Sequence, residues 1–264
     1  MRELLLAGVL LVSAMAAAQE AAPPQEPSKP QAIPSSLSLR EELAHLAVEA
    51  ESLHKELPNF TCKETAVSQA IQKKKVKREV RFSADLRVQR GNDGSDETVH
   101  MTELNGKPYT GAEPSTPIMV RGGFDQVLDY FRLSAQPCYV YTLRAGRVDF
   151  ESTTRSSDDV LCGERGAVQG FALLNSDGDV IHMERRVAEA DAFRYGLVPF
   201  AAVDLAPVEL SGKTYQLSSK MVAEIPRADW LGHFEATYTS CRLFKATITI
   251  RPGSNVVTDE PEKP

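Results

Sequence analysis

Four cysteines and five histidines are the side chains of this sequence that are best suited to chemistry. The cysteines are Cys62, Cys138, Cys162 and Cys241, and each stands alone in the sequence. Zinc sites and thiol redox motifs use cysteine pairs about two to four residues apart, so neither is expected here. A cysteine nucleophile needs a partner histidine and a lowered thiol pKa, and the sequence indicates neither. We therefore expect structural cysteines.

These cysteines indicate two disulfides if the chain is exported, because thiols pair in an oxidising compartment. Sequence alone cannot choose among the possible pairings. We expect Cys138–Cys162 as a local staple, which leaves Cys62–Cys241 to tie the first strand to the last, while the other pairings stay open.

The histidines do not have the spacing of a metal site, apart from one loose pair. They are His45, His54, His100, His182 and His233. His182 and Glu184 would share one face of a strand, but no cysteine pair follows, so a zinc deaminase is not indicated. We interpret this pair as part of a solvated strand face and expect no metal and no cofactor.

Two acidic turns have the oxygen-rich composition of calcium loops. "NSDGD" spans Asn175–Asp179 and "GNDGSDE" spans Gly91–Glu97. An EF-hand starting at Asn175 would need a glutamate at its twelfth position, which is Arg186 here. We expect hairpin turns, with a weak calcium site at either loop as the alternative.

Motifs of the common enzyme classes are missing from the sequence. There is no G-x-S-x-G, H-E-x-x-H, P-loop or G-x-G-x-x-G pattern. We therefore expect no enzyme. A hydrolase with scattered residues would need a histidine and an acid converging on a Ser or Thr hydroxyl.

Charge argues against nucleic acid as a partner. The net charge is -6, which does not suit a polyanion. The basic run Lys73–Arg81 is interpreted as the solvated face of an edge strand, protected from aggregation by its charges. Attraction to anionic lipid is the alternative.

The N-terminus has the pattern of a secretory signal peptide, residues 1–18, with cleavage after Ala18. Its apolar run is shorter than the roughly 20 residues that span a bilayer, and no other run is long enough. We expect a periplasmic or secreted protein with no transmembrane segment in the mature chain. Residues 19–36 form a Pro-rich linker and residues 252–264 a loose tail.

The remaining elements are a helix and a long series of strands. Apolar residues at helical spacing predict a helix over 37–57, with a capping box at Ser38 and Glu41 and a stop at Pro58. From residue 58 to 251 the period becomes two, and short turns such as Asn105-Gly106 favour nine or ten antiparallel strands.

Two irregularities refine this picture. Phe124, Leu128 and Phe131 follow a glycine pair at helical spacing and predict a short inserted helix. The apolar phase changes at Leu243 and Phe244, which predicts a β-bulge that bends the last strand. The expected fold is therefore mainly β: a curled antiparallel meander, or half-open β-barrel, with an N-terminal helix and a short inserted helix.

Several segments together resemble a known group. "LPNFTCKET" after a helix, "LNGKPY" at a hairpin, "GGFDQVLDYF" and "VQGFALLNSDGDVIHMERR" occur in an order similar to that of uncharacterised secreted bacterial proteins. Their strand plan is similar to that of LolA-like periplasmic lipoprotein carriers. The resemblance implies a half-open barrel with a lid, a lipid-sized apolar cavity and no catalytic residue. Two disulfides depart from those carriers and would restrict opening.

The leading hypothesis is an exported, non-enzymatic protein that binds an apolar or lipid-like ligand on the concave face of its sheet. The alternative is an envelope adaptor with protein partners and no small ligand, for which the cavity would be filled. The expected lining residues are the in-phase apolar positions Val80, Phe82, Leu86, Phe124, Leu128, Phe131, Tyr215, Leu217 and Met221.

Overall fold

The computed structural model describes residues 38–244, apart from 92–93, 113, 154–161, 163–166 and 196. The expected signal peptide (1–18), linker (19–36) and tail (252–264) lie outside the described residues. Within the described ranges, no helix is both long enough and apolar enough to cross a membrane.

The N-terminal helix forms where the apolar spacing predicts it. α1 (Leu39–Glu56) begins with a capping box: the Glu41 N–H donates to Ser38 Oγ, and the Ser38 N–H donates to Glu41 Oε2 at 2.9 Å. These bonds satisfy two backbone donors that the first turn would otherwise leave open. Leu46, Ala50 and Leu53 form its buried face.

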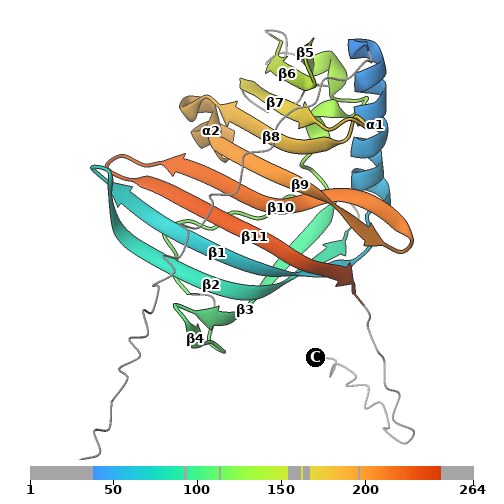
Figure 1. Cartoon of the computed structure of the whole chain (residues 1–264). Helices are drawn as coiled ribbons and strands as arrows, with labels where there is room; N and C mark the ends of the chain where they lie inside the picture. Colours follow the sequence, from blue (N-terminus) through green and yellow to red (C-terminus); the bar gives the residue numbers. More distant parts are fainter. Residues whose placement is uncertain are drawn as a thin grey trace, which may run out of the picture.

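The strands within these described ranges join one antiparallel sheet of eleven strands, which curves around α1 (Figure 1). The strands are β1 (Phe60–Gln72), β2 (Lys75–Arg90), β3 (Ser95–Leu104), β4 (Lys107–Pro108), β5 (Tyr139–Arg144), β6 (Arg147–Ser152), β7 (Val168–Leu174), β8 (Val180–Val187), β9 (Phe200–Leu210), β10 (Lys213–Pro226) and β11 (Leu231–Leu243). Their order is β4-β3-β2-β1-β11-β10-β9-β8-β7-β6-β5. The sheet is open between β4 and β5, so the predicted curled half-barrel is confirmed.

The chain closes on itself at the β1–β11 pair, where a disulfide coincides with a β-bulge. Thr61 lies opposite Arg242 and Lys63 opposite Thr239, so Cys62 faces two residues, Ser240 and Cys241. Cys62 is bonded to Cys241, as expected. The bulge was predicted at Leu243–Phe244, which is wrong: β11 ends at Leu243, and the extra residue lies earlier in the strand.

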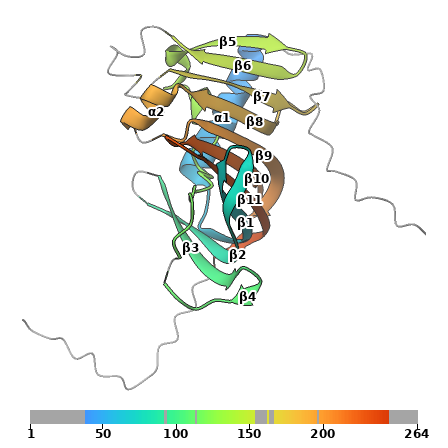
Figure 2. The same ribbon diagram turned by 90° about the vertical axis from the view of Figure 1, so that its left-hand side faces the viewer.

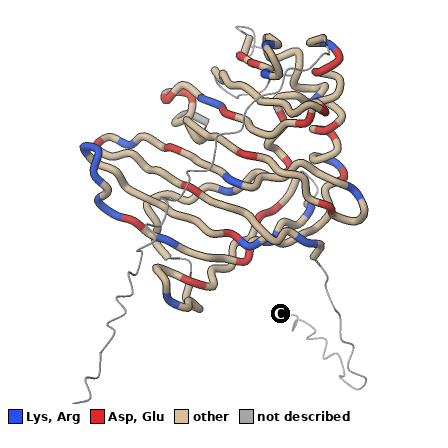
Figure 3. Tube along the Cα trace, in the orientation of Figure 1, with Lys and Arg blue, Asp and Glu red and all other residues tan. Residues whose placement is uncertain are grey.

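The basic end of β2 is a partial edge. β3 pairs with β2 only from Phe82 to Arg90, so the stretch from Lys75 to Arg81 extends beyond its neighbour. Figure 3 shows the blue run of Lys and Arg at the β1–β2 turn. The expectation of an edge strand therefore holds for this half of β2, whereas the other half is interior.

A covering segment, residues 117–138, lies on the same side of the curved sheet as α1 (Figure 2). It was predicted to hold a short amphipathic helix, but it forms a run of turns with two short 3₁₀ helices, η1 (Asp129–Phe131) and η2 (Gln136–Cys138). Its backbone bonds join residues three apart, as from the Gln126 N–H to the Gly123 carbonyl. Gly123 has a φ of 58°, a left-handed conformation that glycine adopts readily and that a regular right-handed helix excludes, so no helix starts at the glycine pair. A further helix, α2 (Glu189–Tyr195), was not predicted.

Candidate functional site

A cavity of about 500 Å³ opens between the covering segment and strands β7 to β10. We call it the concave cavity. Most of its wall is apolar. The lining residues are Val120, Arg121, Gly122, Gly123, Gln126, Val127, Asp129, Tyr130, Val168, Met183, Arg185, Leu197, Val198, Ala201, Val203 and Met221. Its volume lies within the range of about 300–1,000 Å³ that is typical of small-molecule sites.

The floor of this cavity is formed by side chains of β8, β9 and β10 that point to the same face of the sheet. Ala201 and Val203 are two apart on β9, so their side chains point to the same face. Met221 on β10 is paired with Val203, and Met183 on β8 is paired with the same residue. The floor therefore consists of apolar side chains from three neighbouring strands, without a hydrogen-bonding group among them.

Two arginines add positive charge to the wall. Arg121 comes from the covering segment and is exposed, whereas Arg185 comes from β8 and is half-buried. One Arg185 guanidinium N–H donates to the Val198 carbonyl at 2.8 Å, which holds the side chain at the cavity. An apolar floor with guanidinium groups on its wall matches a molecule with an apolar body and an acidic end.

The nine predicted lining residues are all buried, but they occupy different places. Met221 lines the concave cavity. The other eight belong to the hydrophobic core: Val80, Phe82, Leu86, Phe124, Leu128, Phe131, Tyr215 and Leu217. Phe124, for example, packs edge-on against Phe60 and Tyr238, with ring centroids 5.4 and 5.0 Å away. Contact of these nine residues with a ligand stays a prediction.

Sequence reasoning missed most of the actual wall. Met183 lies between His182 and Glu184 and carries the same period-two pattern as the residues chosen, whereas Val203 lies in the apolar run Phe200–Val203, where the alternation is hidden. Val120 and Val127 lie in turns, where no period marks an inward side chain. Only the strand positions could therefore have been found from the sequence.

Buried carboxylates hold the first part of the covering segment. Glu97 on β3 accepts hydrogen bonds from the Gly122 N–H at 2.8 Å and the Phe124 N–H at 3.2 Å. Asp125 accepts from the N–H and the hydroxyl of Ser95, at 2.8 and 2.7 Å. Four hydrogen bonds therefore join β3 to this stretch of the covering segment and fix it to the sheet.

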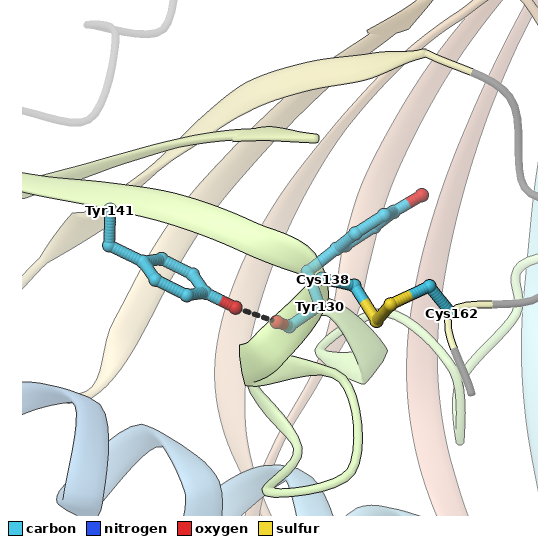
Figure 4. Close-up of a disulfide and its surroundings, with 4 residues drawn as sticks. All are labelled: Tyr130, Cys138, Tyr141 and Cys162. Atoms are coloured by element: carbon cyan, nitrogen blue, oxygen red, sulfur yellow. Dashed lines mark hydrogen bonds between the residues drawn. A yellow bond between two sulfur atoms is a disulfide. The ribbon is translucent and has the colours of Figure 1, made fainter. Parts of the chain in front are cut away.

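The second part of the segment is fastened to β5. The Tyr141 hydroxyl donates to the Tyr130 carbonyl at 2.5 Å, and the Cys138–Cys162 disulfide lies beside it (Figure 4). This is the local pairing that the sequence suggested. The covering segment is thus held at both ends, and the cavity has a fixed roof.

An acidic pair lies beneath the covering segment, next to Arg121. Glu64 on β1 is 4% exposed. Burial, and then the charge of Glu97, raise the pKa of Glu64 to about 7, while Arg121 opposes the rise. Burial likewise raises the pKa of Glu97, although the N–H groups of the covering segment lower it. The sheet beside the concave cavity, on β1 and β3, therefore holds two acids whose pKa values are raised.

His182 and Glu184 are each paired with another side chain. His182 Nδ1 lies 2.6 Å from Asp204 Oδ1 on the neighbouring strand, and Glu184 bonds Arg186. His182 and Glu184 therefore have separate partners, and their interpretation as a solvated strand face stays a prediction. The Ser219 hydroxyl donates to the Asp204 main-chain oxygen rather than completing a triad with His182.

The "NSDGD" stretch forms the predicted hairpin turn. The Asn175 side-chain oxygen accepts from the N–H groups of Asp177 and Asp179, both at 2.9 Å. Asp179 also faces Glu49 of α1. Burial, and then the charge of Asp179, raise the pKa of Glu49 to about 8. In the second acidic stretch, residues 92–93 lie outside the described residues.

The arrangement defines an open, lidded half-barrel with an apolar cavity. No family model and no curated protein matches the sequence. Among solved structures, the chain is similar to a DUF1329 family protein from Desulfovibrio piger (14% identity, TM-score 0.38), with 78% of this chain and 92% of that chain covered.

Two further structures resemble it at a comparable level. One is a LolA superfamily protein from Nitrosomonas europaea (9% identity, TM-score 0.34), covering 78% of this chain and 94% of that one. The other is a putative outer membrane lipoprotein-sorting protein domain from Vibrio parahaemolyticus (12% identity, TM-score 0.39), covering 77% and 92%.

Proposed function

We propose that this protein is an exported, non-enzymatic carrier or binding protein for a small amphiphile with an acidic head group. The concave cavity is the observation that supports the proposal. Its apolar floor is covered by a segment fixed at both ends, yet about 500 Å³ remains open. A purely structural protein would gain stability by filling such a space.

The apolar part of the ligand would lie on the floor formed by Met183, Val203 and Met221. Each methylene that leaves water there contributes about 0.8 kcal/mol, so a short chain suffices for useful affinity. The acidic head would face Arg121 and Arg185. Because Arg121 is exposed, the head group can sit at the rim and keep part of its hydration.

The two disulfides also bear on where the protein is located. Two disulfides suit an oxidising compartment, so we place the protein in the periplasm or outside the cell, after cleavage behind Ala18. Envelope proteins that deliver or receive the ligand are the partners that the proposal requires.

A displacement titration with cis-parinaric acid tests this function. The probe should fluoresce on binding to the mature protein and be displaced by unlabelled fatty acid. The variant Ala201→Trp fills the cavity and should abolish the signal, whereas Thr237→Trp, on an exposed position of β11, should not. No binding by the wild type, or equal binding by both variants, would contradict the proposal.

A further inference from the structure

A second cluster of chemically capable side chains lies between α1 and the β7–β8 turn, away from the concave cavity. His45 and Glu49 are four residues apart on α1, so they share one face of the helix. Asp179 meets them from the end of the turn. One ligand atom from each of the three side chains lies within 4.8 Å of the others.

The turn is pressed closely against the helix at this point. A Cβ on Gly178 would lie 3.4 Å from both Glu42 Oε2 and His45 Cδ2. Gly178 has a φ of 86°, a left-handed conformation that favours glycine. The approach of Asp179 to the helix is therefore built into the backbone.

The Glu49 carboxylate is a second observation that points to a ligand at this cluster. Both of its oxygens are shielded from solvent and accept no side-chain hydrogen bond among the described residues, although the backbone of Val180 lies near enough to lower the Glu49 pKa. It faces a hollow of about 210 Å³, which Asp179 and Gln216 also line. The Gln216 amide oxygen is likewise buried without a partner. Two neighbouring carboxylates, one of them shielded from solvent, are stabilised by a cation between them.

We propose that His45, Glu49 and Asp179 bind a zinc-type divalent metal ion that fastens α1 to the β7–β8 turn. An imidazole with two carboxylates suits zinc, whereas calcium prefers oxygen ligands alone. His45 Nε2 lies 3.6 Å from Asp179 Oδ1, close to the roughly 3.3 Å between ligands of a tetrahedral zinc ion. The exposed side of His45 leaves room for water as the fourth ligand.

The test uses the untagged mature protein after removal of metals with a chelator. Calorimetric titration with zinc chloride should show one ion per chain, and zinc should raise the Tm. Cobalt(II) should give the visible absorption of a tetrahedral site. The variant Glu49→Gln should weaken zinc binding by at least the roughly tenfold that loss of a ligand's supporting partner costs.

Two comparisons make the result decisive. Glu49→Gln replaces a shielded carboxyl group whose pKa burial has raised, so the variant should fold at least as well as the wild type. His100→Ala, at an exposed histidine of β3, should leave zinc binding unchanged. Absence of zinc binding, equal binding by Glu49→Gln, or a response to calcium but not zinc would overturn the proposal. Fatty-acid binding in the concave cavity is independent of this outcome.

Discussion

Glu64 of β1 and Tyr238 of β11 lie directly opposite each other at the centre of the sheet, and both side chains are buried. Glu64 Oε2 and the Tyr238 hydroxyl have no hydrogen-bond partner among the described residues. Burial raises the pKa of Tyr238 well above its usual value, and the charges of Glu64 and Glu97 add to the rise. A negative charge at this pair is therefore costly.

The variant Glu64→Gln should stabilise the protein at alkaline pH. The pKa of Glu64 rises from 4.5 to about 7 on folding, so the folded state holds a proton that the unfolded state has released. Stability is full below pH 4.5 and falls as the pH rises towards 7. The gain from Glu64→Gln should be roughly 3 kcal/mol at pH 8 and near zero at pH 4.

Urea unfolding at the two pH values measures this difference. Glu103→Gln, at an exposed position of β3, is the matched control and should change little at either pH. A Glu64→Gln effect that is independent of pH would show that the buried charge is not the cause.

The variant Glu97→Gln should loosen the covering segment locally. An amide in place of the carboxylate can accept from only one side, so the N–H groups of Gly122 and Phe124 lose a charged acceptor. Hydrogen exchange of these two amides should accelerate by roughly tenfold or more. The Ile118 N–H donates to Ser68 Oγ at 3.0 Å, so its exchange rate should not change. Unchanged hydrogen exchange of the Gly122 and Phe124 amides would contradict the role of Glu97 as an anchor of the covering segment.

Removal of the two disulfides should have unequal effects. The Cys62–Cys241 bond spans 179 residues and the Cys138–Cys162 bond spans 24. On a chain-entropy estimate the first contributes about 5 kcal/mol and the second about 3 kcal/mol. Paired Cys→Ser variants compared by urea unfolding should show this order. The reverse order would mean that strain or unfolded-state structure outweighs loop closure.

The variant Phe124→Ala should be strongly destabilising. Phe124 is fully buried between Phe60 and Tyr238 and joins the covering segment to the sheet. Its truncation should cost about 3–5 kcal/mol in the free energy of unfolding. Phe193→Ala, at an 89% exposed position of α2, should stay within about 0.5 kcal/mol of the wild type. Similar costs for both would contradict this packing.

Local and periodic features were predictable from the sequence. The capping box at Ser38 and Glu41 depends on residues three apart, and the alternation in β2 gives its buried face directly. The expected Cys62–Cys241 bond also placed the first strand beside the last, which is the least local pairing in the sheet.

The cavity was less predictable because it depends on contacts between distant segments. Phe82 and Met221 follow the same strand pattern and both belong to the core, yet only Met221 also lines the cavity. The difference arises from where the covering segment runs, and that path is set by Glu97, Asp125 and Tyr141. No local pattern links these residues to the segment. The cluster of His45, Glu49 and Asp179 likewise appears only when the turn meets α1.

Native mass spectrometry of the exported, oxidised protein, purified without detergent, tests the central claim most directly. The account predicts a mass excess that organic extraction removes and that proves to be a small amphiphile with an acidic head group. A bare mass that stays unchanged after incubation with such amphiphiles would contradict the carrier function, and it would favour an envelope adaptor without a small ligand.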